Sequence, residues 1–211
     1  MRTVGLAVAT AIAAPAALSS PAWAKAGDPV KVSDGLTIDP IIDARLRYEG
    51  VDQPATDADS ATLRLRAGAE FRMHRLGLLV EGEGTLGIVN DYNAFPFAIA
   101  DQQRRPQFST VADPMNVELN RLQLQYKGTK ATLTLGRQRI NLDDQRWVGA
   151  AAWRQNEQTF DAVRGEAQFG PVSLDGTYAI SQRTIYGIDA GPRQSLDGTF
   201  VFGSAAVKAG P

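Results

Sequence analysis

The chain has 211 residues, with 22 Lys and Arg against 23 Asp and Glu, and it contains no cysteine. The near-zero net charge gives no support for a nucleic-acid partner, and the absence of cysteine excludes a disulfide. Beyond the N-terminus no window is apolar enough for a membrane helix or shows long helical periodicity, so a helical protein is not expected.

The N-terminus has the three parts of a secretory signal. Arg2 supplies a positive charge, residues 4–18 form an apolar stretch, and Ala22-Trp23-Ala24 is an A-x-A cleavage pattern. The stretch is too short for an N-terminal membrane anchor of about 20 apolar residues. We therefore expect a signal peptide over residues 1–24, a mature start at Lys25 and export from the cytoplasm.

Two early segments, residues 36–49 and 61–73, are strand candidates: apolar and polar residues alternate over residues 42–49 of the first and strictly over the whole of the second. In the second, every other residue from Ala61 to Met73 is apolar. Successive side chains of a strand point to opposite faces, so this period of two indicates strands. Their length exceeds the usual five or six residues of a soluble strand but fits a tilted membrane strand of about 9–11 residues with extensions.

Three short turns, at His74-Arg75, Gly128-Thr129 and Gly170-Pro171, place apolar residues opposite apolar ones and polar opposite polar. A slip of one residue would scramble both faces. Gly128 suits the first central position of a type II′ turn. An eighth strand is predicted at residues 196–207. The predicted pairs are Phe71–Leu78 and Arg66–Glu83, then Leu124–Leu133, Leu122–Leu135 and Gln125–Thr132, then Val163–Tyr178 and Arg164–Thr177.

The connections between these strands alternate between short and long, and the long ones cover residues 50–60, 89–116, 138–159 and 182–195. Outer-membrane barrels have short periplasmic turns and long extracellular loops, whereas a soluble β-sandwich has no reason to place every long loop at one end. The sequence therefore predicts an all-β, antiparallel up-and-down transmembrane β-barrel over residues 36–211. It would have about eight strands and follow a short periplasmic segment at residues 25–35.

An apolar outer face leaves a polar inner face, and the predicted inner face is rich in arginine. Two interpretations remain open: the arginines line a pathway for anions, or they pair with carboxylates across strands, as Arg66 does with Glu83. A closed eight-stranded barrel would be filled by side chains, while sixteen or more strands leave a channel. The inner-face charges are Arg45, Arg47, Arg64, Arg66, Arg72, Arg121 and Arg164, with Asp43, Glu70, Glu81, Glu83 and Glu166.

Residues 135–147 read LGRQRINLDDQRW and residues 153–162 read WRQNEQTFDA. This string resembles the alginate-export family of outer-membrane proteins. The resemblance implies a wide monomeric barrel, typically about twice as long as this chain, with an arginine-rich conduit for anionic polysaccharide or related solutes. It also places Arg137, Arg139, Arg146 and Arg154 at the rim or constriction. The alternative is a loop that packs on itself through Arg–Asp contacts, Trp147 and Trp153.

Outer-membrane barrels commonly end in an amphipathic strand with a terminal aromatic residue, and the barrel-assembly machinery recognises this strand. Residues 205–211 do not form such a strand, so we expect this chain to be the N-terminal part of a larger barrel. An open half-barrel would leave unpaired strand edges in lipid, which is not tolerated. Closure as eight strands, a partner or further sequence is expected.

The sequence contains no convincing catalytic, cofactor or metal site. His74 is the single histidine and lies in a predicted turn, and no G-x-S-x-G or H-E-x-x-H string occurs. Asp91, Asp101 and Asp113 share the longest loop, but their spacing matches no Ca²⁺ loop, which favours a solvated surface. Arg104-Arg105 in that loop either contact lipopolysaccharide or substrate, or are simply solvated.

These observations favour an outer-membrane channel or export pore of a Gram-negative bacterium, for anionic, alginate-like polysaccharide or small anionic or sugar solutes. No enzymatic activity is expected, and outer-membrane lipid and lipopolysaccharide are the expected surroundings. Three alternatives remain: a non-conducting structural eight-stranded barrel, a soluble periplasmic β-barrel binding protein, and an outer-membrane hydrolase that uses His74.

Overall fold

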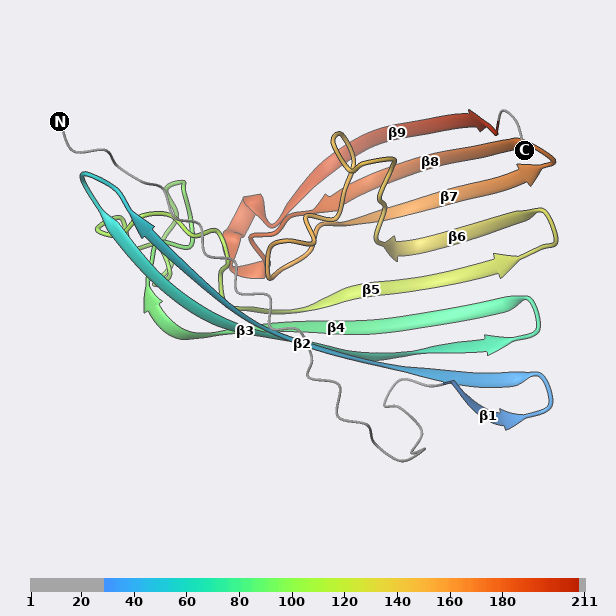
Figure 1. The fold of residues 1–211 in the computed structure, drawn as a ribbon, viewed down its shortest axis with the longest axis horizontal. Coiled ribbons are helices and arrows are strands. Elements are labelled where there is room, and N and C mark those ends of the chain that lie inside the picture. The colour runs from blue at the N-terminus through green and yellow to red at the C-terminus, as the bar shows by residue number, and fades with distance from the viewer. Residues whose placement is uncertain (1–28, 209–211) are drawn as a thin grey trace.

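The computed structural model describes residues 29–208, so the expected signal peptide and the cleavage site before Lys25 lie outside the described residues. Nine strands form one antiparallel sheet in which each strand pairs with the next along the chain, which confirms the all-β, up-and-down prediction (Figure 1). The strands are β1 Val30–Ser33, β2 Leu36–Asp52, β3 Asp57–Met73, β4 Leu76–Asp91, β5 Asn116–Lys127, β6 Ala131–Gln138, β7 Thr159–Phe169, β8 Val172–Arg183 and β9 Ser195–Val207.

Strand β1 was not predicted, and it makes the ninth strand of the sheet. It lies inside the segment expected to be a short periplasmic extension and turns into β2 at Gly35, whose φ of 83° favours glycine. Four residues are too few for a period-two pattern to be recognised, so this strand depends on pairing with β2 rather than on its own sequence.

Short turns lie at one end of the sheet and the longer connections lie at the other, as Figure 1 shows. The connection predicted at residues 50–60 is mostly strand, because β2 and β3 pair as far as Asp52 and Asp57. This extension is supported by packing: Ala58 is buried against Tyr92 and Phe95 of the loop at residues 92–115. The 3-10 helix η1, Ile188–Arg193, contributes Ala190 to the same cluster.

The predicted register is confirmed at the first and third turns, including Arg66 opposite Glu83 and Val163 opposite Tyr178. The register predicted at the second turn is wrong by two residues. Leu124 lies opposite Leu135, because the turn spans residues 128–131 and closes through the Gly128 N–H, which donates to the Ala131 carbonyl. A shift of two residues keeps every side chain on its face, so the apolar pattern cannot detect it.

The two faces of the sheet, called here the apolar face and the polar face, differ in exposure in the sense opposite to a soluble protein. Leu65 and Leu133 are 49% and 51% exposed, whereas Arg64 and Arg66 are only 4% and 6% exposed. No helix in residues 29–208 is both long and apolar enough to cross a membrane. The exposed apolar side chains include Leu46, Leu63, Leu65, Leu78, Leu86, Ile88, Leu122, Leu124, Leu133, Leu135, Val163, Leu174, Tyr178 and Val201.

A lysine on each face of β5 tests this assignment. Leu122→Lys places a charge on the apolar face, and we expect it to lower the free energy of unfolding from lipid vesicles by about 2–4 kcal/mol, the cost of a cation near the bilayer midplane. The neighbouring change Gln123→Lys adds the same charge on the polar face and should cost less than about 1 kcal/mol. Equal losses in the two variants, measured by urea titration, would contradict the face assignment.

Candidate functional site

The connection between β6 and β7, residues 139–158, runs across neighbouring strands instead of extending beyond the end of the sheet, and we call it the inward loop (Figure 1). It lies on the polar face, because its side chains contact polar-face residues of four strands. Gln155, Asn156 and Glu157 near its end are 0%, 1% and 2% exposed, although all three are polar. Such burial requires that their hydrogen bonds be satisfied by the sheet.

Gln155 connects the inward loop to β2 and β3. Its Oε1 accepts a hydrogen bond from Arg45 Nε at 2.9 Å, and its Nε2 donates to Thr62 Oγ1 at 2.8 Å. Its backbone N–H donates to Asp113 Oδ1 at 2.9 Å. One residue therefore joins two strands to the loop that follows β4.

Asn156 and Glu157 continue these contacts toward β4 and β5. Asn156 Oδ1 accepts from Thr85 Oγ1 at 2.7 Å. Glu157 forms ion pairs with Arg66 of β3 and Arg139 of the inward loop, each at 2.6 Å, and accepts from Asn120 Nδ2 at 3.1 Å. Three consecutive side chains, the Gln155–Glu157 segment, thus attach the inward loop to β2, β3, β4 and β5.

The buried charges beneath this segment are paired. Arg66 lies between Glu83, its cross-strand partner, and Glu157. Glu81 accepts from both Asn120 at 2.9 Å and Arg121 at 2.6 Å. An irregularity in the β4–β5 pairing brings these two consecutive β5 residues to the same carboxylate. Removing one partner from a buried ion pair typically costs about 3–5 kcal/mol, so the network holds the loop strongly.

The other half of the inward loop is held by apolar packing. Ile140 is fully buried against Phe160 and Ala162 of β7, and Phe200 and Phe202 of β9 pack on the same cluster. The rings of Phe160 and Phe202 meet edge to face, with centroids 5.5 Å apart. The polar face is therefore mainly polar over β2–β5 but apolar over part of β7–β9. The sequence had predicted a polar inner face on all the strands.

Three residues of the inward loop other than glycine have positive φ: Asp143 at 49°, Gln145 at 61° and Ala151 at 51°. This conformation costs on the order of 1–3 kcal/mol for such residues and persists only where surrounding contacts impose it. Trp147 and Trp153 lie beside these positions and are 92% and 63% exposed. The Arg154 guanidinium lies over the Trp153 ring, 4.0 Å from its centroid, and burial lowers its pKa from the usual value.

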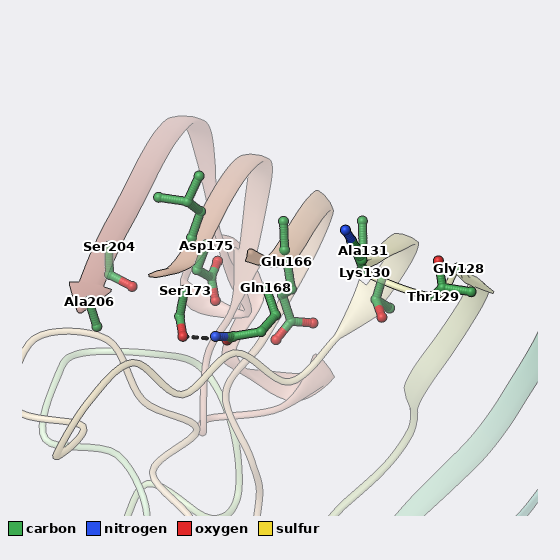
Figure 2. A pocket seen from close by; sticks show the side chains of 13 residues that line it. Gly128, Thr129, Lys130, Ala131, Glu166, Gln168, Ser173, Asp175, Ser204 and Ala206 are labelled. Carbon is green, nitrogen blue, oxygen red and sulfur yellow. Dashed lines mark hydrogen bonds between the residues drawn. The ribbon is translucent and has the colours of Figure 1, made fainter. Parts of the chain in front are cut away.

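A separate hollow of about 420 Å³ lies near the short-turn end, between β6 and β9. Figure 2 shows that polar side chains line it, among them Glu166 and Asp175, with Ser173 hydrogen-bonded to Gln168. Arg164 pairs with both carboxylates, at 3.1 Å and 3.0 Å, so these two carboxylates are satisfied within the sheet.

Most of the arginines singled out in the sequence have partners within the chain. Arg137 differs in position, because it lies opposite Leu122 in the register, and so on the apolar face, where it pairs with Asp161 at 2.8 Å. Arg146 is largely exposed and pairs with Asp144 at 3.0 Å. The partners of the others are Gln155 and Ala152 for Arg45, Glu49 and Asp113 for Arg47, Asp43 for Arg64, Glu83 and Glu157 for Arg66, Glu70 for Arg72, Glu81 for Arg121, Glu157 for Arg139, and Asp175 for Arg164.

Two groups of residues went unrecognised in the sequence. Gln155, Asn156 and Glu157 lie in the stretch that resembles the family, but no role was predicted for them, because their contacts are with strands that are distant in the sequence. The apolar patch had a visible signal, since residues 200–202 read Phe-Val-Phe and are apolar on both faces. Asp113 was expected to be solvated, yet it is 1% exposed because it binds Arg47 and the Gln155 N–H.

The remaining candidates take no part in a site. His74 is exposed at the turn between β3 and β4. Arg104 and Arg105 donate to backbone carbonyl groups of Phe97 and Gln102 in their own loop. Across residues 29–208, no group of three or more His, Asp or Glu side chains is arranged to hold a metal ion.

Comparison with known families gives a clear result. The family model described as "Alginate export" matches residues 42–207, which include most of β2, all of β3 to β9 and the inward loop. The chain belongs to the alginate-export family. Alginate-export proteins are outer-membrane transport channels rather than enzymes. Comparisons with curated proteins and with solved structures returned no match.

Loss of the Glu157 carboxylate should release the inward loop of this alginate-export protein. In Glu157→Ala, Arg66 and Arg139 each lose a buried partner, so we expect the free energy of unfolding to fall by about 3–5 kcal/mol and proteolysis within residues 139–158 to become faster. Asp144→Ala removes a carboxylate from the same loop, but from an exposed pair, and should cost less than about 1 kcal/mol. Similar losses in both variants would show that the Glu157 network does not hold the loop.

Proposed function

We propose that this chain forms part of the wall of an outer-membrane export channel for an anionic, alginate-like polysaccharide or for small anionic or sugar solutes. The observation that carries the proposal is the distribution of exposure on the sheet: leucines are exposed on one face, and arginines lie on the opposite face beneath an anchored loop. An apolar face suits lipid, and a charged face suits an aqueous lumen. Family membership supports the same assignment.

The inward loop narrows the proposed channel. It lies across the polar face and is anchored at both halves, so it occupies lumenal space at a constant position. Barrels of this kind place their long loops at the extracellular side, which puts the short turns in the periplasm. The end of the sheet that carries the long loops would then meet lipopolysaccharide. Insertion of the barrel would depend on the barrel-assembly machinery.

The nine strands act within a closed barrel in this proposal. Within residues 29–208 the sheet is open, since β1 and β9 are its two edges and do not pair with each other. Thirteen residues of β9 present an unpaired edge, which lipid does not tolerate. Further strands pairing with these edges would complete the barrel. An open nine-stranded sheet does not support a closed eight-stranded structural barrel, and the exposed leucines do not support a soluble periplasmic protein.

Ion selectivity tests the proposal directly. Protein extracted from outer membranes and placed in planar bilayers should conduct with a preference for anions, measured as a reversal potential in a salt gradient. A single guanidinium about 8 Å from a passing anion in water contributes about 0.5 kcal/mol, so Arg45→Gln should reduce the anion-to-cation permeability ratio about twofold.

Arg137→Gln is the matched control, since Arg137 lies opposite Leu122 on the apolar face and should leave the ratio unchanged. Lack of conductance, or a preference for cations in the unaltered protein, would exclude an anion pathway.

A further inference from the structure

Two tryptophans of the inward loop are exposed on the side of the sheet that lipid does not reach. Trp147 is 92% exposed, more than any other large apolar side chain among residues 29–208, and Trp153 is 63% exposed. Most of the other strongly exposed apolar residues of the strands belong to the apolar face, where lipid would cover them. An indole left in water on the polar face is unfavourable, and such a residue commonly marks a binding surface.

Both tryptophans line the same hollow, which has a volume of about 600 Å³. This volume lies within the range of about 300–1,000 Å³ that is usual for small-molecule sites. Its remaining lining combines small residues with groups able to hydrogen-bond, namely Asp144, Gln145 and Gln158. A sugar ring has the complementary surface, because its C–H face is apolar and its rim carries hydroxyl groups.

Cationic groups adjoin both tryptophans. Arg154 stacks on Trp153, and the Arg47 guanidinium also lies over that ring, 5.8 Å from its centroid. The Arg154 side chain is only 16% exposed: its Nε and Nη1 are buried without a hydrogen-bond partner among residues 29–208, and Nη1 lies 3.9 Å from Glu49. Arg146 precedes Trp147 and is largely exposed. These guanidinium groups suit a ligand that carries carboxylates.

The hollow is held in one shape. Its tryptophans follow backbone positions with unfavourable φ, Gln145 and Ala151, and the loop on either side is fixed by Ile140 and by the Gln155–Glu157 segment. A loop held in this way presents the two indoles without further ordering, which lowers the entropy cost of binding. Strain that is maintained by surrounding contacts is typical of functional positions.

We propose that Trp147 and Trp153 form a sugar-binding subsite on the inward loop, in which the indoles stack on sugar rings and Arg146 and Arg154 bind sugar carboxylates. The ligand is a residue of an acidic polysaccharide. This inference rests on the proposed function and refines it, since it makes the inward loop a place where the passing polysaccharide is held by its rings as well as by its charge.

Binding is measured on protein extracted from outer membranes in detergent, with a short alginate oligosaccharide as the probe and a neutral glucan oligosaccharide of the same length as its control. Saturable quenching of tryptophan fluorescence by the acidic probe is expected, with weaker quenching by the neutral one. In planar bilayers the acidic probe should interrupt the current in discrete, resolvable blocks.

Substitution separates stacking from folding. Trp147→Ala and Trp153→Ala should each raise the dissociation constant, read from the duration and frequency of current blocks, about two- to tenfold, the effect of one aromatic contact. Trp147→Phe keeps an aromatic face and should stay within about twofold of the unaltered protein. Phe169→Leu is the matched control, because Phe169 is 52% exposed at the β7–β8 turn, away from the loop, and no change is expected.

The outcomes distinguish the subsite from the channel. A protein that conducts but shows neither quenching nor blocks overturns the subsite and leaves the channel standing. Quenching without any conductance supports the subsite and removes the channel. An unchanged dissociation constant in Trp147→Ala and Trp153→Ala overturns the role of the indoles, and equal binding of the neutral oligosaccharide overturns the acidic ligand.

Discussion

Buried guanidinium groups on the polar face need acceptors, and this requirement decides where the inward loop lies. Arg66 is almost fully covered and has one carboxylate, Glu83, directly across the β3–β4 pair. Glu157 supplies a second one from the inward loop, which is distant from Arg66 in the sequence. Because an unpaired buried charge is so costly, the pairing of Glu157 with Arg66 fixes where the loop lies.

The loop in turn gives the two halves of the polar face different characters. Over β2–β5 it adds amide and carboxylate groups that complete a polar network, and over β7–β9 it adds Ile140 to a cluster of phenylalanines. Buried ion pairs therefore anchor one half of the loop and apolar packing anchors the other. The segment between the anchors is left to present Trp147 and Trp153 toward open space.

Ion pairs within the chain occupy most of the arginines that were expected to line an anion pathway. Most guanidinium groups of the polar face are engaged with carboxylates or carbonyl oxygens of the same chain, so both interpretations of the arginines hold in part. The guanidinium groups with weaker partners are Arg45 of β2, which donates to an amide and to carbonyl oxygens, and two arginines of the inward loop. Arg146 has one exposed partner, and Arg154 has a carboxylate at 3.9 Å. Arg146 is the more exposed of the two, at 74%, whereas Arg154 is 16% exposed.

The sequence by itself determined the eight longer strands and most of their faces, because a period of two sorts side chains without reference to any distant residue. It predicted the pairing of Arg66 with Glu83 across a two-residue turn for the same reason. It did not distinguish Leu124 opposite Leu133 from Leu124 opposite Leu135, since both registers keep the faces intact.

Only the tertiary structure decided the course of the inward loop. The contacts of Gln155 with Arg45 and Thr62 join residues 110 and 93 positions apart, and no local pattern encodes them. The same holds for Phe160 on β7, whose partners lie on β9. Local periodicity predicts the faces of side chains within one strand. The course of the loop depends instead on the buried charges and aromatic rings of distant strands that need partners.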